Sequence, residues 1–198
     1  MSIDPRTPSR LLPAGALALA GAALAAYPAL RGYAVEDGLA AAELYARPAW
    51  LWAHALAMVG FALVAWGLGA VHALAQRWMT VGLVLLLPYY GAEAYGLHAV
   101  GRRVVETGDA AVLAAGDGAA DLFRYEPVAV TLFALGWVAL AVAGALLVRG
   151  APRDPRLRRA GLVLTGVALA TYLPQFFLPA PGRVAHGVVA AVGLVALA

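Results

Sequence analysis

Residues 50–73 read WLWAHALAMVGFALVAWGLGAVHA, a stretch that contains no Asp, Glu, Lys or Arg. It is longer than the roughly 20 apolar residues that an α-helix needs to cross the hydrocarbon core of a bilayer. Five further stretches are mostly apolar and of similar length, at 11–30, 78–100, 127–148, 160–178 and 182–198, and two of them contain one charged residue each, Glu93 and Arg183. We therefore expect an all-α fold, a polytopic bundle of six transmembrane helices that forms one domain over residues 1–198. Two longer segments, 32–49 and 101–126, are expected to be outer loops.

The composition of the whole chain agrees with this expectation. Of the 198 residues, 63% are hydrophobic and 13% are charged, whereas a soluble domain carries about 25% charged residues. These values exclude a soluble enzyme and also a disordered chain, which would be polar and highly charged. The chain has no Cys, which excludes disulfides, thiolate nucleophiles and cysteine-bound metal centres.

The first apolar stretch has two interpretations. It follows Arg6 and Arg10 and contains an alanine-rich run near residues 23–26, a pattern that cleaved signal peptides also show. Its length of about 20 apolar residues favours a helix that is retained in the membrane.

The charges predict the orientation of the bundle. If the six helices alternate in direction, eight Arg and two Asp fall on one side of the membrane: Arg6, Arg10, Arg77, Arg149, Arg153, Arg156, Arg158 and Arg159, against Asp4 and Asp154. The other side has six Arg and eight acidic residues. Basic loops remain in the cytoplasm, so we expect a multi-pass protein of the cell membrane with both termini cytoplasmic. The sequence pI near 9.5 then reflects topology, and we expect no nucleic-acid partner.

Three histidines are predicted to lie at one depth. Counted from the outer ends of their stretches, His54, His98 and His186 all lie about one helical turn inside the membrane. Neutral imidazole is the commonest metal ligand. The leading hypothesis is therefore a redox protein that binds haem b or a transition metal ion through these histidines. Such a protein would exchange electrons with a quinone. The alternative is that each histidine only forms a hydrogen bond near the interface.

Glu93 supports a second hypothesis, because ionisable residues inside a membrane are expensive and functional by default. Glu93 and Tyr95 are candidate catalytic residues of a membrane-embedded enzyme that acts on a lipid or isoprenoid. A structural hydrogen bond from Glu93 to Tyr89, Tyr90 or Arg183 is the alternative.

Several other polar residues are expected to line the same outer cavity. Pro88 and Pro174 interrupt two of the helices, and irregular backbone at this depth is tolerated where it lines a cavity. The further lining candidates are Tyr89, Tyr90, Thr131, Tyr172, Gln175 and Arg183. Membrane lipid and a quinone or lipid-like ligand are the expected partners. A third hypothesis is an accessory subunit, bound to other membrane subunits, or a small-solute transporter.

Overall fold

The computed structural model describes residues 8–151 and 155–198, and this part of the chain is helical without strands. Asp4, Arg6, Arg153 and Asp154, which contribute to the predicted charge asymmetry, lie outside the described residues.

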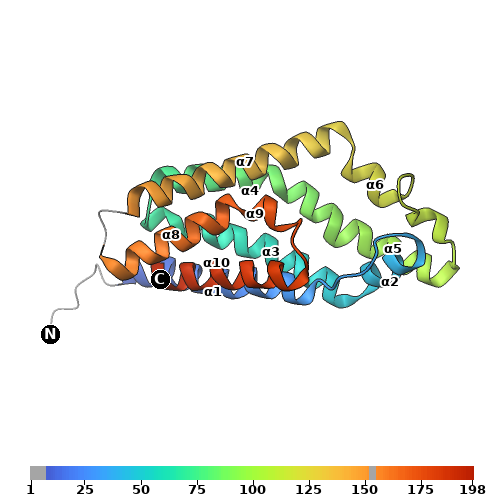
Figure 1. Cartoon of the computed structure of the whole chain (residues 1–198), viewed down its shortest axis with the longest axis horizontal. Coiled ribbons are helices and arrows are strands. Elements are labelled where there is room, and N and C mark those ends of the chain that lie inside the picture. The colour runs from blue at the N-terminus through green and yellow to red at the C-terminus, as the bar shows by residue number, and fades with distance from the viewer. Residues whose placement is uncertain (1–7, 152–154) are drawn as a thin grey trace.

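Six long helices form the body of the molecule. They are α1 (Pro8–Leu30), α3 (Pro48–Gly67), α4 (Ala73–Gly91), α7 (Pro127–Gly150), α8 (Arg156–Ala170) and α10 (Ala180–Leu197). Each packs against two others, and together they close a ring in the order α1, α3, α4, α7, α8, α10. The side chains inside the ring are almost all apolar and include Phe61, Leu140 and Leu194. The ring thus buries one continuous core. Figure 1 shows the helices running along the long axis of the molecule.

Proline and acidic residues define where two of these helices begin. Pro48 and Pro127 occupy first-turn positions in α3 and α7, where the missing N–H is not needed. The carboxylate of Glu126 accepts a hydrogen bond from the backbone N–H of Ala129 at 2.8 Å. This carboxylate caps α7, as its place before Pro127 predicts.

Four segments are long and apolar enough to cross a membrane: Leu11–Leu30, Pro48–Ala70, Pro127–Gly150 and Ala180–Leu197. The described structure is therefore all-helical with four candidate membrane spans, two fewer than the six predicted. The bounds of helices α4 and α8 differ from those of the stretches expected at 78–100 and 160–178. The helix after residue 73 continues through η2 (Ala92–Gly96) into α5 (Leu97–Thr107), whereas α8 ends early at Ala170.

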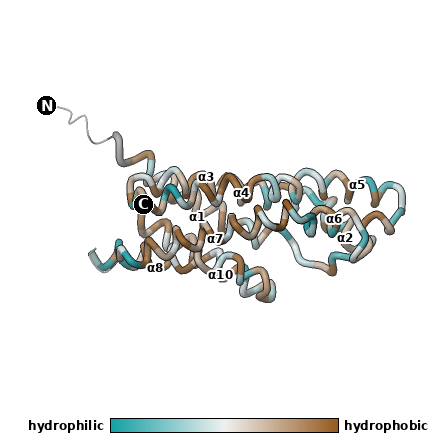
Figure 2. Tube along the Cα trace, turned by 90° about the horizontal axis from the view of Figure 1, so that it is seen from above, coloured by the Kyte–Doolittle hydropathy of each residue, from teal (hydrophilic) through white to brown (hydrophobic). Residues whose placement is uncertain are grey.

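The segments predicted as outer loops form a small cap at one end of the ring. The cap consists of α2 (Gly38–Ala46), α5, η3 (Ala110–Leu113) and α6 (Ala119–Arg124). Tyr45, Trp50, Leu97 and Val104 are at the centre of its separate core. Figure 2 shows hydrophilic residues concentrated in the cap and at the opposite end, with apolar residues between them.

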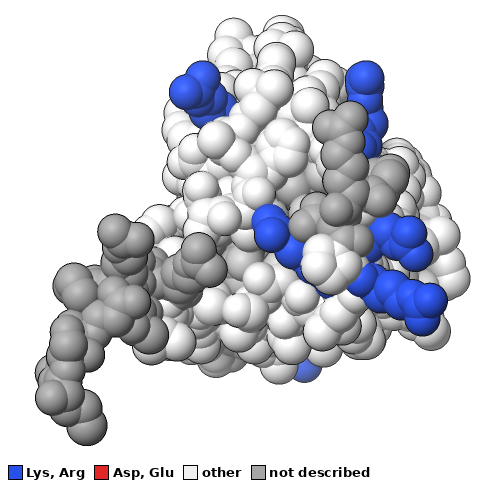
Figure 3. Space-filling view, turned by 90° about the vertical axis from the view of Figure 1, so that its left-hand side faces the viewer, with Lys and Arg blue, Asp and Glu red and all other residues white. Residues whose placement is uncertain are grey.

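The first helix begins and the last helix ends at the opposite end of the molecule, so the start of α1 and the end of α10 lie there (Figure 1). Among the described residues on the face seen in Figure 3, basic side chains are present and no acidic side chain appears. Arg149 in the last turn of α7 and Arg156, Arg158 and Arg159 at the start of α8 belong to this end.

Two glycines set the distance between α7 and α8. A Cβ atom placed on Gly144 or on Gly166 would collide with the backbone carbonyl oxygen of the other glycine. Small residues allow such close approach of membrane helices. The close contact holds α7 and α8 together at these two residues.

Candidate functional site

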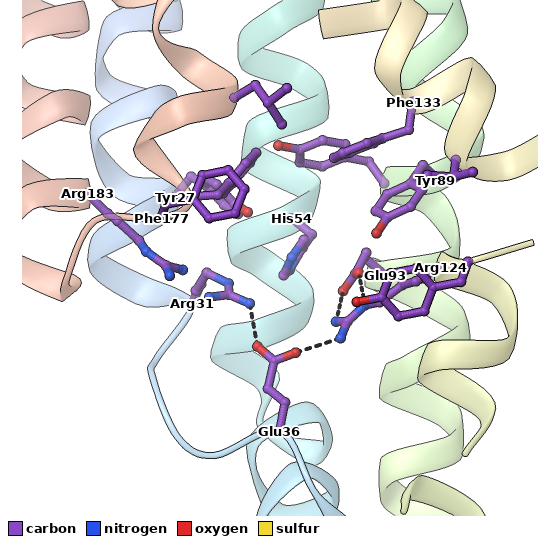
Figure 4. Close-up of a pocket in the computed structure, with 15 residues that line it drawn as sticks. Tyr27, Arg31, Glu36, His54, Tyr89, Glu93, Arg124, Phe133, Phe177 and Arg183 are labelled. Atoms are coloured by element: carbon purple, nitrogen blue, oxygen red, sulfur yellow. Dashed lines mark hydrogen bonds and ion pairs between the residues drawn. The ribbon is translucent and has the colours of Figure 1, made fainter. Parts of the chain in front are cut away.

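A cavity of about 460 Å³ lies inside the ring where the six helices meet the cap. Its walls come from α1, α3, α4, η2, α6, α7 and α10, and from the segment around α9 (Tyr172–Gln175). Figure 4 shows these side chains converging on one space. The lining residues are Tyr27, Arg31, Glu36, His54, Tyr89, Tyr90, Glu93, Arg124, Tyr125, Val130, Phe133, Leu173, Phe176, Phe177 and Arg183.

The cavity is open on the side of the ring. Among its lining residues Tyr125 is 73% exposed, Val130 is 40% exposed and Phe177 is 86% exposed, so these three mark the mouth. The mouth lies between the start of α7 and the segment that follows α9. It exists because α8 ends at Ala170, and the short α9 with Pro174 inside it replaces the last turns of a full-length helix.

Four charged side chains form a continuous network along one wall. Arg124 donates from Nε and Nη2 to the two carboxylate oxygens of Glu93, at 2.7 and 3.0 Å. Its Nη1 donates to Glu36 at 2.7 Å, and Arg31 donates to the other oxygen of Glu36 at 2.8 Å. The two-point contact between Arg124 and Glu93 has the fork geometry that makes such pairs strong and directional. The network ties α1, η2 and the cap together.

Glu36 is ionised in this network. Its burial favours the neutral carboxyl, but the guanidinium groups of Arg124 and Arg31 and the hydrogen bonds from Arg124 and Tyr45 outweigh it, so the pKa of Glu36 lies below its usual value. The lowered pKa keeps Glu36 negatively charged between the two guanidinium groups at neutral pH.

A π-helical turn positions Glu93. Pro88 lies inside α4, and the next turn, η2, has the π-helical pattern. Such turns occur mostly as single bulges inside α-helices, often at functional sites. The indole N–H of Trp50 donates to the backbone carbonyl of Glu93 at 2.7 Å, so α3 fixes the same turn from the side. The side chain of Glu93 is thereby held toward the cavity and Arg124 (Figure 4).

Aromatic rings form the deeper wall of the cavity. The ring of His54 meets Tyr27 edge-on, with centroids 5.3 Å apart, and lies 6.1 Å from Tyr90. Below this layer Trp137 stacks on Tyr172, with centroids 4.8 Å apart and planes inclined by 10°. The deeper part of the cavity is therefore mainly aromatic, and the charged network lies toward the cap.

The structure does not bring the three predicted ligand histidines together. Nδ1 of His54 donates to the carbonyl of Trp50 at 2.8 Å, and Nδ1 of His98 donates to the carbonyl of Tyr45 at 2.8 Å. Nε2 of His186 lies 3.0 Å from the carbonyl of Ala168. Only His54 of the three lines the cavity, and residues 8–151 and 155–198 contain no group of three His, Asp or Glu suited to a metal ion.

The three histidines have separate partners because the helices do not end where the apolar stretches end. The helix that carries His98 continues to Thr107, so His98 packs against the cap. The early end of α8 instead provides the partners of His186, at Ala168 and Thr171. Each histidine thus forms the hydrogen bond that the alternative interpretation expects.

The remaining predicted residues divide into two groups. Glu93, Tyr89, Tyr90 and Arg183 line the cavity as expected. The others do not line it, and their positions differ. Tyr95 is 60% exposed, and exposed Thr131 donates to the carbonyl of Pro127 in its own helix, whereas Tyr172 and Gln175 are buried in the layer below.

Arg31, Glu36 and Arg124 were missed as site residues, because in the sequence they count only as loop charges. One signal could have indicated them. A buried carboxylate needs a cation, and Glu93 has no basic residue within its own apolar stretch. The expected partners were Tyr89, Tyr90 and Arg183, and the observed partner is Arg124.

Comparisons with known proteins provide no relative from which a role could be transferred, since no family model, no curated protein and no solved structure matches the chain.

Proposed function

We propose that the chain is a multi-pass protein of the cell membrane whose six long helices all cross the bilayer, and that its cavity binds an amphipathic, lipid-like molecule. The observation that carries the proposal is the position of the mouth. One candidate membrane span, α7, flanks it on one side, and the segment that leads from α9 to a second candidate span, α10, flanks it on the other. Two of its rim residues, Val130 and Phe177, are apolar and exposed. A ligand dissolved in the bilayer would reach the cavity through such an opening.

The interior of the cavity suits the same kind of ligand. Apolar and aromatic side chains form the deep wall, and the polar groups gather at one side near the cap. A mostly apolar pocket with a few convergent polar groups is the usual form of a small-molecule site. An amphipathic molecule would place its polar head at the charged network and its tail between α7 and the segment after α9.

The environment of Glu93 favours binding over acid–base catalysis. Both of its oxygens accept hydrogen bonds from Arg124, so neither oxygen is free of a donor. Tyr95, the other candidate catalytic residue, is outside the cavity lining. Haem or metal binding remains a prediction from the sequence that no contact in the described structure favours.

The test compares lipids that co-purify with three proteins: the wild type, Val130→Trp and Val138→Trp. Both substitutions place a large ring on α7, but Val130 lines the mouth and Val138 is an exposed residue outside the lining. Native mass spectrometry of protein in a neutral maltoside detergent should find about one bound amphipathic molecule per chain in the wild type and in Val138→Trp. It should find much less in Val130→Trp. Equal amounts in all three proteins would contradict a ligand in this cavity.

A further inference from the structure

The charges that line the cavity do not balance. Three arginines, Arg31, Arg124 and Arg183, face two carboxylates, Glu36 and Glu93. Every oxygen of the two carboxylates accepts a hydrogen bond from Arg31 or Arg124. No acidic side chain of residues 8–151 and 155–198 forms an ion pair with Arg183. The cavity wall therefore carries one arginine that no carboxylate of the described residues pairs with.

The geometry concentrates this charge beside Arg31. The guanidinium carbon of Arg183 lies 5.3 Å from the centre of the Tyr33 ring, and that of Arg31 lies 5.5 Å from the same centre. In Figure 4 the side chain of Arg183 extends from α10 toward Arg31. The Nε atom of Arg183 donates to the carbonyl of Leu178 at 2.8 Å, which fixes the side chain in this direction and leaves its two terminal nitrogens for another acceptor.

A second unused donor lies on the same wall. Nε of Arg31 is buried and has no hydrogen-bond partner among the described residues. Because this atom is buried, a ligand in the cavity meets Arg31 through its positive charge, and the donors that it can reach directly are the terminal nitrogens of Arg183. Phosphate and carboxylate groups are the acceptors that match guanidinium donors.

We infer that Arg183 and Arg31 form an anion-recognition site and that the ligand of this cavity carries a negatively charged head group of the phosphate or carboxylate type. This inference rests on the proposed function, because it assigns the head group of the amphipathic ligand. The apolar part of that ligand then lies along Tyr27, Phe133 and Phe177, which line the same cavity. A neutral amphiphile lacks the group that would pair with Arg183.

The experiment measures the binding of three probes to the purified full chain in maltoside detergent, by isothermal titration and by the shift of the melting temperature. The probes are dodecyl phosphate, dodecanol and inorganic phosphate. The proteins are the wild type, Arg183→Gln, Arg183→Lys and Arg103→Gln. Arg103 is an exposed residue of α5, so its substitution makes the same change in charge away from the cavity.

We expect the wild type and Arg103→Gln to bind dodecyl phosphate about tenfold more tightly than dodecanol, a difference of roughly 1.4 kcal/mol. Arg183→Gln should lose this preference, and Arg183→Lys should keep most of it because the charge remains. Equal binding of dodecyl phosphate and dodecanol by the wild type would overturn the anion site while supporting the lipid-like ligand.

The other outcomes separate the two proposals. Failure of both dodecyl probes, together with tight binding of inorganic phosphate that Arg183→Gln abolishes, would support the anion site and overturn the lipid-like ligand. If none of the three probes binds the wild type, both proposals fail. Dodecanol binding also reports on folding, since an Arg183→Gln protein that still binds dodecanol has an intact cavity.

Discussion

Arg124 and Glu93 form a charged pair at a place where charge is costly. Their side chains are only 16% and 9% exposed, and 31 residues separate them in the sequence. Taking two ions out of water costs several kcal/mol for each ion, which good geometry and additional hydrogen bonds must offset. Here the contact between Arg124 and Glu93 is bidentate, and the third nitrogen of Arg124 donates a hydrogen bond to Glu36.

Arg124→Gln should therefore destabilise the protein more than the loss of one surface ion pair would. The substitution leaves Glu93 buried without its cation, a change that typically costs about 3–5 kcal/mol. The free energy of unfolding in detergent, measured by denaturant titration, should fall by about this amount. Arg124→Gln combined with Glu93→Gln should recover part of the loss, because the unpaired charge is then absent.

Arg102→Gln provides the matched control for this prediction. The side chain of Arg102 is 63% exposed and lies 4.0 Å from Glu106, and exposed pairs of this kind contribute about 0–1 kcal/mol. If Arg124→Gln had no larger effect than Arg102→Gln, the network would not hold the cap to the ring.

At the level of the helices, the short α8 explains both a close contact and an opening. It packs tightly on α7 through Gly144 and Gly166, whereas its early end at Ala170 leaves the ring open on the side toward the cap. α9 partly fills the space, and Leu173 forms part of the cavity wall.

Gly166→Ala should weaken the packing of α7 against α8. The added methyl group meets the backbone carbonyl oxygen of Gly144 and a side-chain methyl group of Val148, and the backbone oxygen has no room to move aside. Overpacking of this kind typically costs about 1–3 kcal/mol. A fall of the melting temperature in detergent, relative to the wild type, is the expected result. Gly15→Ala is the control because nothing lies within 4 Å of the added atom. Equal melting temperatures for the two variants would show that the glycine contact is not tight.

At the scale of the whole molecule, the number of membrane crossings is the quantity most in need of measurement. Four segments meet the criteria of length and apolar character, and α4 and α8 do not meet them alone. Their place in a closed ring with those four segments supports six crossings, since an interrupted ring would expose buried helix faces.

Single cysteines test this topology on a chain that has no native Cys. We expect a membrane-impermeant maleimide to label, in intact cells, a single cysteine that replaces Glu43, Asp117 or Leu178. Cysteines at Arg77 and Arg156 should react only after the membrane is permeabilised. This alternation requires α4 and α8 to cross the bilayer as well as α3 and α7. Labelling of Asp117 and Arg77 from the same side would instead show that α4 does not cross.

The sequence alone predicted the number of long helices and most of their bounds, as well as a buried acid at Glu93. These features depend on local composition, because a run of apolar residues forms a helix and an ionisable residue inside that run is conspicuous. The structure places the ends of two helices elsewhere than the sequence predicts. The helix expected to end at residue 100 continues through the polar α5 into the cap, and α8 ends at Ala170 because Pro174 interrupts the following turn.

The partners within the site depend on which helices are neighbours, and hydrophobic periodicity carries no information on that. Arg31, Glu36 and Arg124 lie in segments that the sequence identifies only as loops, and the packing of the cap on the ring brings them to Glu93. The same packing separates His98 and His186 from His54. A side chain's depth along one helix follows from counting residues, whereas its partner across the bundle follows only from tertiary contacts.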